Sequence, residues 1–170
     1  MGKQNKLAEA KEWAKNVVDS LEKPIDKGIL DLVIVLHAFG ITTTMSCEGH
    51  VSWGTGGPYV DVEDPKAATI MQEFIRYKKL PTKADKALNE RNKLNMKYAS
   101  VLVKLLDQFY KTHSAAIEDR IILKLQQDIR IQNQGAEINA FRSRVERQWH
   151  LKRYQKEFNV FTKFLYTLAS

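Results

Sequence analysis

The period of the apolar residues changes along this chain, and that change restricts the fold more than any other feature. Over most of the sequence apolar residues recur every three to four positions, as in helices with one buried face. They alternate with polar residues on both sides of the glycine-rich loop 49–58, and again near 120–134, as in half-buried strands. We therefore expect an α+β fold. The predicted helices are 4–21, 25–39, 65–80, 83–111 and 137–168, and the predicted strands are 41–47, 59–63, 120–125 and 128–134.

The lengths of the last two helices constrain the overall shape. Helices of about 29 and 32 residues are roughly 44–48 Å long at 1.5 Å per residue. A compact chain of 170 residues has a radius of gyration of only about 15–16 Å. We expect one domain with a small, mostly antiparallel sheet of about four strands and helices on its apolar face. The helices 83–111 and 137–168 are expected to project as an antiparallel pair or to bend.

The cysteine content and the length of the apolar runs bear on where in the cell the protein is expected to be. Cys47 is the only cysteine, which excludes an internal disulfide and a zinc site built from several cysteines. The first fifteen residues are polar and amphipathic, unlike a signal peptide, and the apolar run 29–39 is too short to cross a bilayer. We expect a cytoplasmic protein with no membrane partner.

The formal net charge is +7, and its distribution is uneven. Residues 41–63 contain no Lys or Arg, whereas 64–115 carry eleven basic and five acidic side chains, and 135–170 carry seven and three. A basic excess on predicted helices favours a polyanionic partner such as nucleic acid. A solvated helix surface is the alternative.

Polar side chains concentrate on the strands around the glycine-rich loop. Strict alternation would place Thr44, Ser46 and Glu48 on one sheet face with Tyr59, Asp61 and Glu63. The later hairpin would add Lys124, Asp128, Arg130, Gln132 and Gln134 to its own polar face. We expect His50, Glu48 and Asp61 to lie around one cavity, and, because 41–63 lacks a cation, Arg130 is expected to lie close enough to offset both carboxylates. The predicted ligand-binding residues are Thr44, Ser46, Trp53, Tyr59, Asp61, Arg130 and Gln132.

The segment Ser46-Cys47-Glu48-Gly49-His50 holds the residue types that catalysis uses most. Cys47 could act as a nucleophile with His50 as its base and Glu48 beside it. However, Cys47 has the parity of Ile41 and Met45, which predicts a buried structural cysteine, and no nearby cation lowers its pKa. Cys47 and His50 are also a pair of metal-ligand types, but two ligands are few. No metal site is predicted, and no cofactor is assigned. Trp53, among glycines, could stack on a ligand or base.

Two resemblances involve this segment. The pattern Thr-x-x-Ser-Cys-Glu-Gly-His, followed by a Gly/Pro-rich loop and Tyr-Val-Asp, resembles a small group of uncharacterised bacterial and phage-type proteins. The run from a helix into a Thr-rich strand ending in Ser46, Cys47 and Gly49 is similar to wybutosine-synthesis tRNA methyltransferases, in which an arginine stands at the position of His50. That similarity implies S-adenosylmethionine and an RNA substrate.

Three functions are consistent with these observations. The first is a pocket that binds or transforms a small polar ligand at the 46–50 loop and the polar sheet face. The second is an RNA-binding or RNA-modifying protein with basic helices. The third is a helical interaction protein without enzymatic activity. The sequence leaves open whether the chain is an enzyme, and it does not indicate an oligomeric state.

Overall fold

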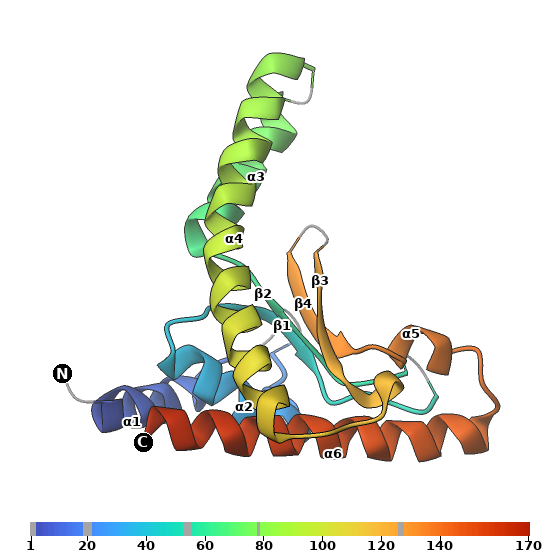
Figure 1. Cartoon of the computed structure of the whole chain (residues 1–170). Helices are drawn as coiled ribbons and strands as arrows, with labels where there is room; N and C mark the ends of the chain where they lie inside the picture. Colours follow the sequence, from blue (N-terminus) through green and yellow to red (C-terminus); the bar gives the residue numbers. More distant parts are fainter. Residues whose placement is uncertain (1–2, 19–21, 53–55, 78, 126–127) are drawn as a thin grey trace.

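The computed structural model describes residues 3–18, 22–52, 56–77, 79–125 and 128–170, and its fold is α+β as predicted (Figure 1). The predicted turn at 126–127 lies outside the described residues. The helices are α1 (Lys3–Ala14), α2 (Lys27–Ala38), α3 (Pro65–Tyr77), α4 (Pro81–Thr112), the 3-10 helix η1 (Ile117–Asp119), α5 (Ala136–Asn139) and α6 (Arg144–Ala169). The strands are β1 (Thr43–Cys47), β2 (Tyr59–Val62), β3 (Ile121–Leu125) and β4 (Ile129–Asn133).

The four strands form one antiparallel sheet in the order β1-β2-β4-β3. The hairpin β3–β4 is predicted correctly. The other edge of β4 pairs with β2, which lies about 70 residues earlier in the chain. In this pairing Asp61 is opposite Arg130 and Val60 is opposite Ile131. Directly opposed residues of antiparallel strands share a face. The register therefore decides which side chains meet.

One face of the sheet packs on helices and forms the core. Val60, Val62, Ile129 and Ile131 are buried there, each at most 1% exposed. Helices α2, α4 and α6 cover them, as Figure 1 shows for α6 beneath the sheet. The apolar residues that alternate along the strands thus pack against helices, as their alternation predicts. We call this the helix-packed face. The helix residues of this core include Leu32, Leu36, Leu102, Leu105, Phe109, Phe158, Phe161 and Leu165.

The two longest helices, α4 and α6, do not form the antiparallel pair that was one of the two expected arrangements. The N-terminal part of α4 pairs with α3, and this helical hairpin projects away from the sheet (Figure 1). The C-terminal part of α4 enters the core through Leu102 and Phe109, while α6 runs across it. Arg91 of α4, 4% exposed, ties the base of the hairpin to β2 through Glu63, with Nη2 2.6 Å from Oε1.

The predicted helix 137–168 is divided in two. Helix α5 ends at Asn139 and α6 begins at Arg144. Ser143 caps α6: its hydroxyl accepts a bond from the backbone N–H of Glu146, and the Glu146 carboxylate accepts one from the backbone N–H of Ser143. This capping box starts a new helix and turns the preceding residues out of its axis. The first predicted helix also ends early, at Ala14 instead of Leu21.

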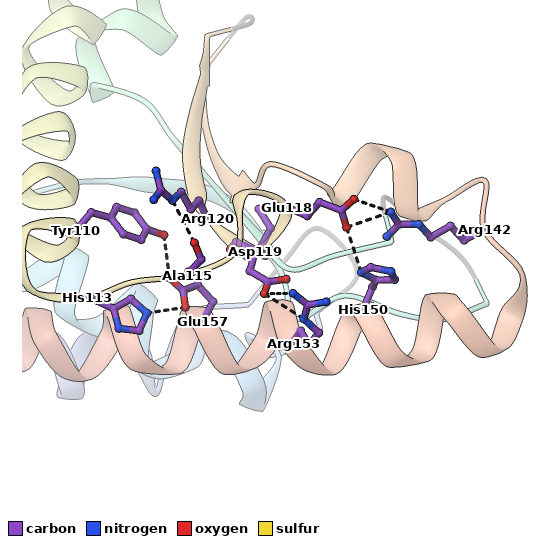
Figure 2. A network of polar contacts seen from close by, with 11 residues as sticks. Tyr110, His113, Ala115, Glu118, Asp119, Arg120, Arg142, His150, Arg153 and Glu157 are labelled. Atoms are coloured by element: carbon purple, nitrogen blue, oxygen red, sulfur yellow. Dashed lines mark hydrogen bonds and ion pairs between the residues drawn. The ribbon is translucent and has the colours of Figure 1, made fainter.

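Polar contacts fasten the segment 113–120 to α6 (Figure 2). Glu157, 6% exposed, accepts bonds from the Tyr110 hydroxyl and contacts His113 Nε2, both at 2.9 Å. Burial raises the pKa of Tyr110, so it remains a donor at neutral pH. One turn earlier in α6, Arg153 pairs with Asp119 at 2.5 Å. These bonds fix the start of β3, and through it the register of β4.

Among the described residues, the structure contains no helix that combines the length and the apolar character needed to span a membrane.

Candidate functional site at the end of β1

A bulge in β1 reverses the expected placement of its side chains. The pairing shifts between Thr43 and Met45, so that Met45 is opposite Asp61 and Cys47 is opposite Tyr59. An extra residue in one strand moves every following side chain to the other face. The prediction that Ser46 shares a face with Tyr59 and Asp61 is therefore wrong: Ser46 is opposite Val60 of the helix-packed face.

The second face of the sheet, which we call the Arg130 face, carries a fixed guanidinium. Arg130 donates from Nε and Nη2 to the two carboxylate oxygens of Asp61, at 2.7 and 2.6 Å. The guanidinium also lies over the Tyr59 ring, 4.0 Å from its centroid. The bond to Asp61 raises the pKa of Arg130. Burial raises the pKa of Tyr59, which keeps the hydroxyl protonated. The predicted Arg130–Asp61 pair is thus present.

Glu48 has a different role from the one predicted. Its carboxylate accepts a bond from the backbone N–H of Gly28 at 2.8 Å, in the first turn of α2. A carboxylate there satisfies a free N–H and complements the positive end of the helix dipole. In the described chain Arg130 pairs with Asp61 and not with Glu48, so the expected sharing of Arg130 by both carboxylates is wrong. Glu48 instead holds α2 against the end of β1.

Cys47 is buried, 8% exposed, as predicted. It lies on the Arg130 face, not on the helix-packed face as its parity suggested. Burial raises the pKa of the thiol, and the nearby carboxylates of Asp26 and Glu48 raise it further, while Arg130 acts in the opposite direction. A thiol with a raised pKa is a poor nucleophile at neutral pH. The backbone N–H of Gly49 donates to its Sγ at 3.3 Å.

The structure brings Asp26 to the motif, and the sequence had not indicated this residue. Asp26 precedes α2, and its Oδ2 accepts a bond from the backbone N–H of Glu48 at 3.2 Å. His50 Nε2 is 3.9 Å from the same oxygen. A carboxylate oxygen of Asp26, the Sγ of Cys47 and a ring nitrogen of His50 all lie within 4.8 Å of one another. Three different metal-ligand types therefore converge beside the Arg130 face.

Gly49 makes this convergence sterically feasible. It has a φ of +85°, a conformation that residues with a Cβ rarely adopt. A Cβ there would lie 2.8 Å from the backbone of Gly57 and 2.7 Å from Leu151. The close approach of the loop to the strand end brings His50 back toward Cys47.

The remaining predicted residues lie around this centre or apart from it. Thr44 is exposed at the bulge, and Gln132 is buried opposite Tyr59. Trp53 lies outside the described residues. Two hollows are present elsewhere: one of about 180 Å³ beside Phe39 and Leu168, and one along the exposed side of α4 near Lys86 and Asn89. Neither is lined by a predicted site residue.

Several of the arginines that contribute to the basic excess are engaged inside the protein. Arg91 pairs with Glu63, Arg142 with Glu118, and Arg153 with Asp119. A cation that offsets a neighbouring carboxylate attracts a polyanion less than a free one does. The formal charge of the basic segments thus overstates what they offer to nucleic acid.

Comparisons of this chain with protein family models, with curated proteins and with solved structures found no match.

Proposed function

We propose that this protein is a metal-dependent enzyme of the hydrolytic type, with Asp26, Cys47 and His50 as ligands of a zinc-class ion and a small polar molecule as substrate. The observation that carries the proposal is the mutual approach of their three ligand atoms, all within 4.8 Å. Carboxylate, thiolate and imidazole are the three side-chain ligands that zinc takes in proteins.

The distances suit a small ion once the three ligands close on it. Zinc bonds of about 2.0–2.3 Å in a tetrahedron place ligand atoms about 3.3–3.7 Å apart. His50 Nε2 and Asp26 Oδ2 are now 3.9 Å apart, and the three ligand atoms lie within 4.8 Å of one another, so binding requires a closure of up to roughly an ångström. The His50 side chain is 27% exposed and lies on a loop, where such a movement is feasible.

Backbone groups support two of the three ligands. The N–H of Glu48 donates to Asp26 and the N–H of Gly49 donates to Cys47. Such outer bonds orient metal ligands and stabilise their anionic forms. Every residue from 47 to 50 thereby acquires a role: Cys47 and His50 as ligands, Glu48 as the anchor of α2, and Gly49 as the turn between them.

Three protein ligands leave one position for water, which is the arrangement of catalytic zinc sites. A bound zinc ion lowers the pKa of that water to about 7 and makes it a nucleophile at neutral pH. Asp26 is 39% exposed at its side chain, so solvent reaches the site. Tyr59 is opposite Cys47 in the sheet, its ring lies against the Arg130 guanidinium, and its hydroxyl donates to the sulfur of Met45 on the same face. Tyr59 and Arg130 would orient a small polar substrate beside the activated water.

Cobalt(II) substitution tests both the ligand set and the open position. Cobalt bound to Asp26, Cys47 and His50 should give intense visible bands typical of a tetrahedral ion, and a near-ultraviolet charge-transfer band from the Cys47 thiolate. Adding azide or acetohydroxamate should then shift the visible bands, because an exchangeable water leaves the fourth position to the added ligand.

The outcomes separate catalytic from structural binding. A tetrahedral spectrum that azide and acetohydroxamate leave unchanged would contradict the enzymatic proposal and indicate a closed, structural ion. A spectrum without the thiolate band, or one that persists unchanged in Cys47→Ser, would contradict the ligand set itself.

A further inference from the structure

Four large apolar side chains are exposed where α5 meets α6. Ile138 is 58% exposed, Phe141 92%, Val145 79% and Trp149 56%. Val145 and Trp149 are four positions apart on one side of α6, whereas Ile138 lies in α5 and Phe141 in the turn between the two helices. Single exposed apolar residues are common, but four large ones within twelve residues of the chain mark a candidate interaction site. We call these four residues the Phe141 surface.

The backbone that carries these side chains is held by local contacts. The capping box of Ser143 and Glu146 sets the start of α6, and the Asn139 side chain donates to the carbonyl of Gly56 at 2.6 Å, which holds α5. Arg153 also lies over the Trp149 ring, 4.4 Å from its centroid. The Phe141 surface is therefore presented on an ordered scaffold, which lowers the entropic cost of binding.

Unpaired basic side chains lie on α6 beside the Phe141 surface. Residues 135–170 carry seven basic and three acidic side chains, and two of the basic ones, Arg142 and Arg153, pair with Glu118 and Asp119 from the preceding segment. All three carboxylates are engaged: Glu137 with Lys124, Glu146 with Ser143, and Glu157 with Tyr110 and His113. By contrast, Arg144, Lys152 and Lys156 are exposed, and no described residue forms an ion pair with them. Lys152 and Lys156 continue the helical stripe that begins with Val145 and Trp149.

We propose that the Phe141 surface docks an acidic amphipathic segment of a partner protein. Apolar side chains of that segment would cover Phe141, Val145 and Trp149, and its carboxylates would reach Arg144 and Lys152. An exposed aromatic pair beside an unpaired cation is the composition of interface hot spots. The matching charges would steer the encounter and make its rate depend on salt.

The charge also argues against a second copy of this chain as the occupant. A symmetric contact would place this basic surface against itself, and the chain as a whole carries +7. The aliphatic residues Ile138 and Val145 favour a protein over nucleic acid, because bases stack on aromatic rings and gain little from branched aliphatic side chains.

A binding experiment with the full chain tests this proposal. The probe is a fluorescein-labelled 20-residue helical peptide with Leu at every third or fourth position and Glu elsewhere. Fluorescence anisotropy should show binding that weakens at least tenfold in the variant Phe141→Ser/Trp149→Ser. The variant Met96→Ser/Val103→Ser, which removes two exposed apolar residues of α4, should bind as the unmodified chain does. The single variant Phe141→Ser serves if the first double variant unfolds, since Phe141 is 92% exposed.

Three results would overturn the proposal. The first is an absence of peptide binding, or equal weakening in both double variants. The second is binding of oligouridylate that Phe141→Ser/Trp149→Ser abolishes while peptide binding is unchanged, which would assign the surface to nucleic acid. The third is a dimer in sedimentation velocity that the same variant dissociates, which would assign it to a second copy.

Discussion

Replacing Arg130 by alanine is expected to lower the free energy of unfolding by about 3–5 kcal/mol, the cost of breaking a buried ion pair by removing one partner. Asp61 is 3% exposed at its side chain, and Arg130 supplies two hydrogen bonds to it, at 2.7 and 2.6 Å. Without the guanidinium, a buried carboxylate in the centre of the sheet would be left unpaired. Chemical denaturation followed by circular dichroism measures the change.

Two further variants make the interpretation specific. Arg144→Ala removes an exposed arginine at the start of α6 and should change the stability by less than about 0.5 kcal/mol. Asp61→Asn combined with Arg130→Ala should recover part of the loss, since it removes the uncompensated charge. Equal stability of Arg130→Ala and the unmodified chain would mean that this ion pair does not hold the sheet.

The second large effect concerns the proposed metal centre. We expect each of Asp26→Asn, Cys47→Ser and His50→Ala to reduce the affinity for zinc by more than about a hundredfold, because loss of even an outer-shell partner costs about 10–100-fold. Competition with a chromophoric chelator measures the affinity. Asp26→Asn retains the acceptor for the Glu48 N–H, so it removes the negative ligand with little change in shape.

Matched controls exist on the same helix. Asp31 is an exposed carboxylate five residues after Asp26, and His37 stacks on Trp13 with ring centroids 3.9 Å apart. Neither Asp31→Asn nor His37→Ala should change zinc affinity. A loss of affinity in these controls as large as in the three ligand variants would show that the effect comes from the surface or from unfolding, and not from a defined site.

Much of the fold follows from the spacing of apolar residues. The four strands lie within one or two residues of their predicted positions, because alternation is unambiguous when one face is buried. The Arg130–Asp61 pair could also be predicted, since 41–63 contains carboxylates but no cation and β4 offers an arginine of suitable parity. Local pattern and charge balance are sufficient for these features.

The candidate site depends on two features that no local pattern contains. The bulge between Thr43 and Met45 adds one residue to β1, which exchanges the faces of Ser46 and Cys47. In the sequence, Asp26 only indicates the start of a helix. The packing of α2 against the end of β1 brings its carboxylate close to Cys47 and His50. Contacts between distant segments set this geometry, so the spacing of Cys47 and His50 indicated two ligands and missed the third.

The division of the last helix had a signal in the sequence. Ser143-Arg144-Val145-Glu146 has the spacing of a capping box, which marks a helix start inside an apparently continuous repeat. In a continuous helix 137–168 the apolar spacing would place Phe141, Val145 and Trp149 on the buried face, whereas the structure exposes all three. Apolar periodicity specifies a helical face, but the core covers only the part of that face from Leu151 onward.

X-ray absorption at the zinc edge of the protein loaded with one equivalent of zinc tests the central claim most directly. A centre built from Asp26, Cys47 and His50 predicts one sulfur at about 2.3 Å and three nitrogen or oxygen neighbours at about 2.0–2.1 Å, one of them water. The sulfur contribution should disappear in Cys47→Ser, since Cys47 is the only cysteine. A zinc ion surrounded by nitrogen and oxygen alone, or by six neighbours, would contradict the proposed centre.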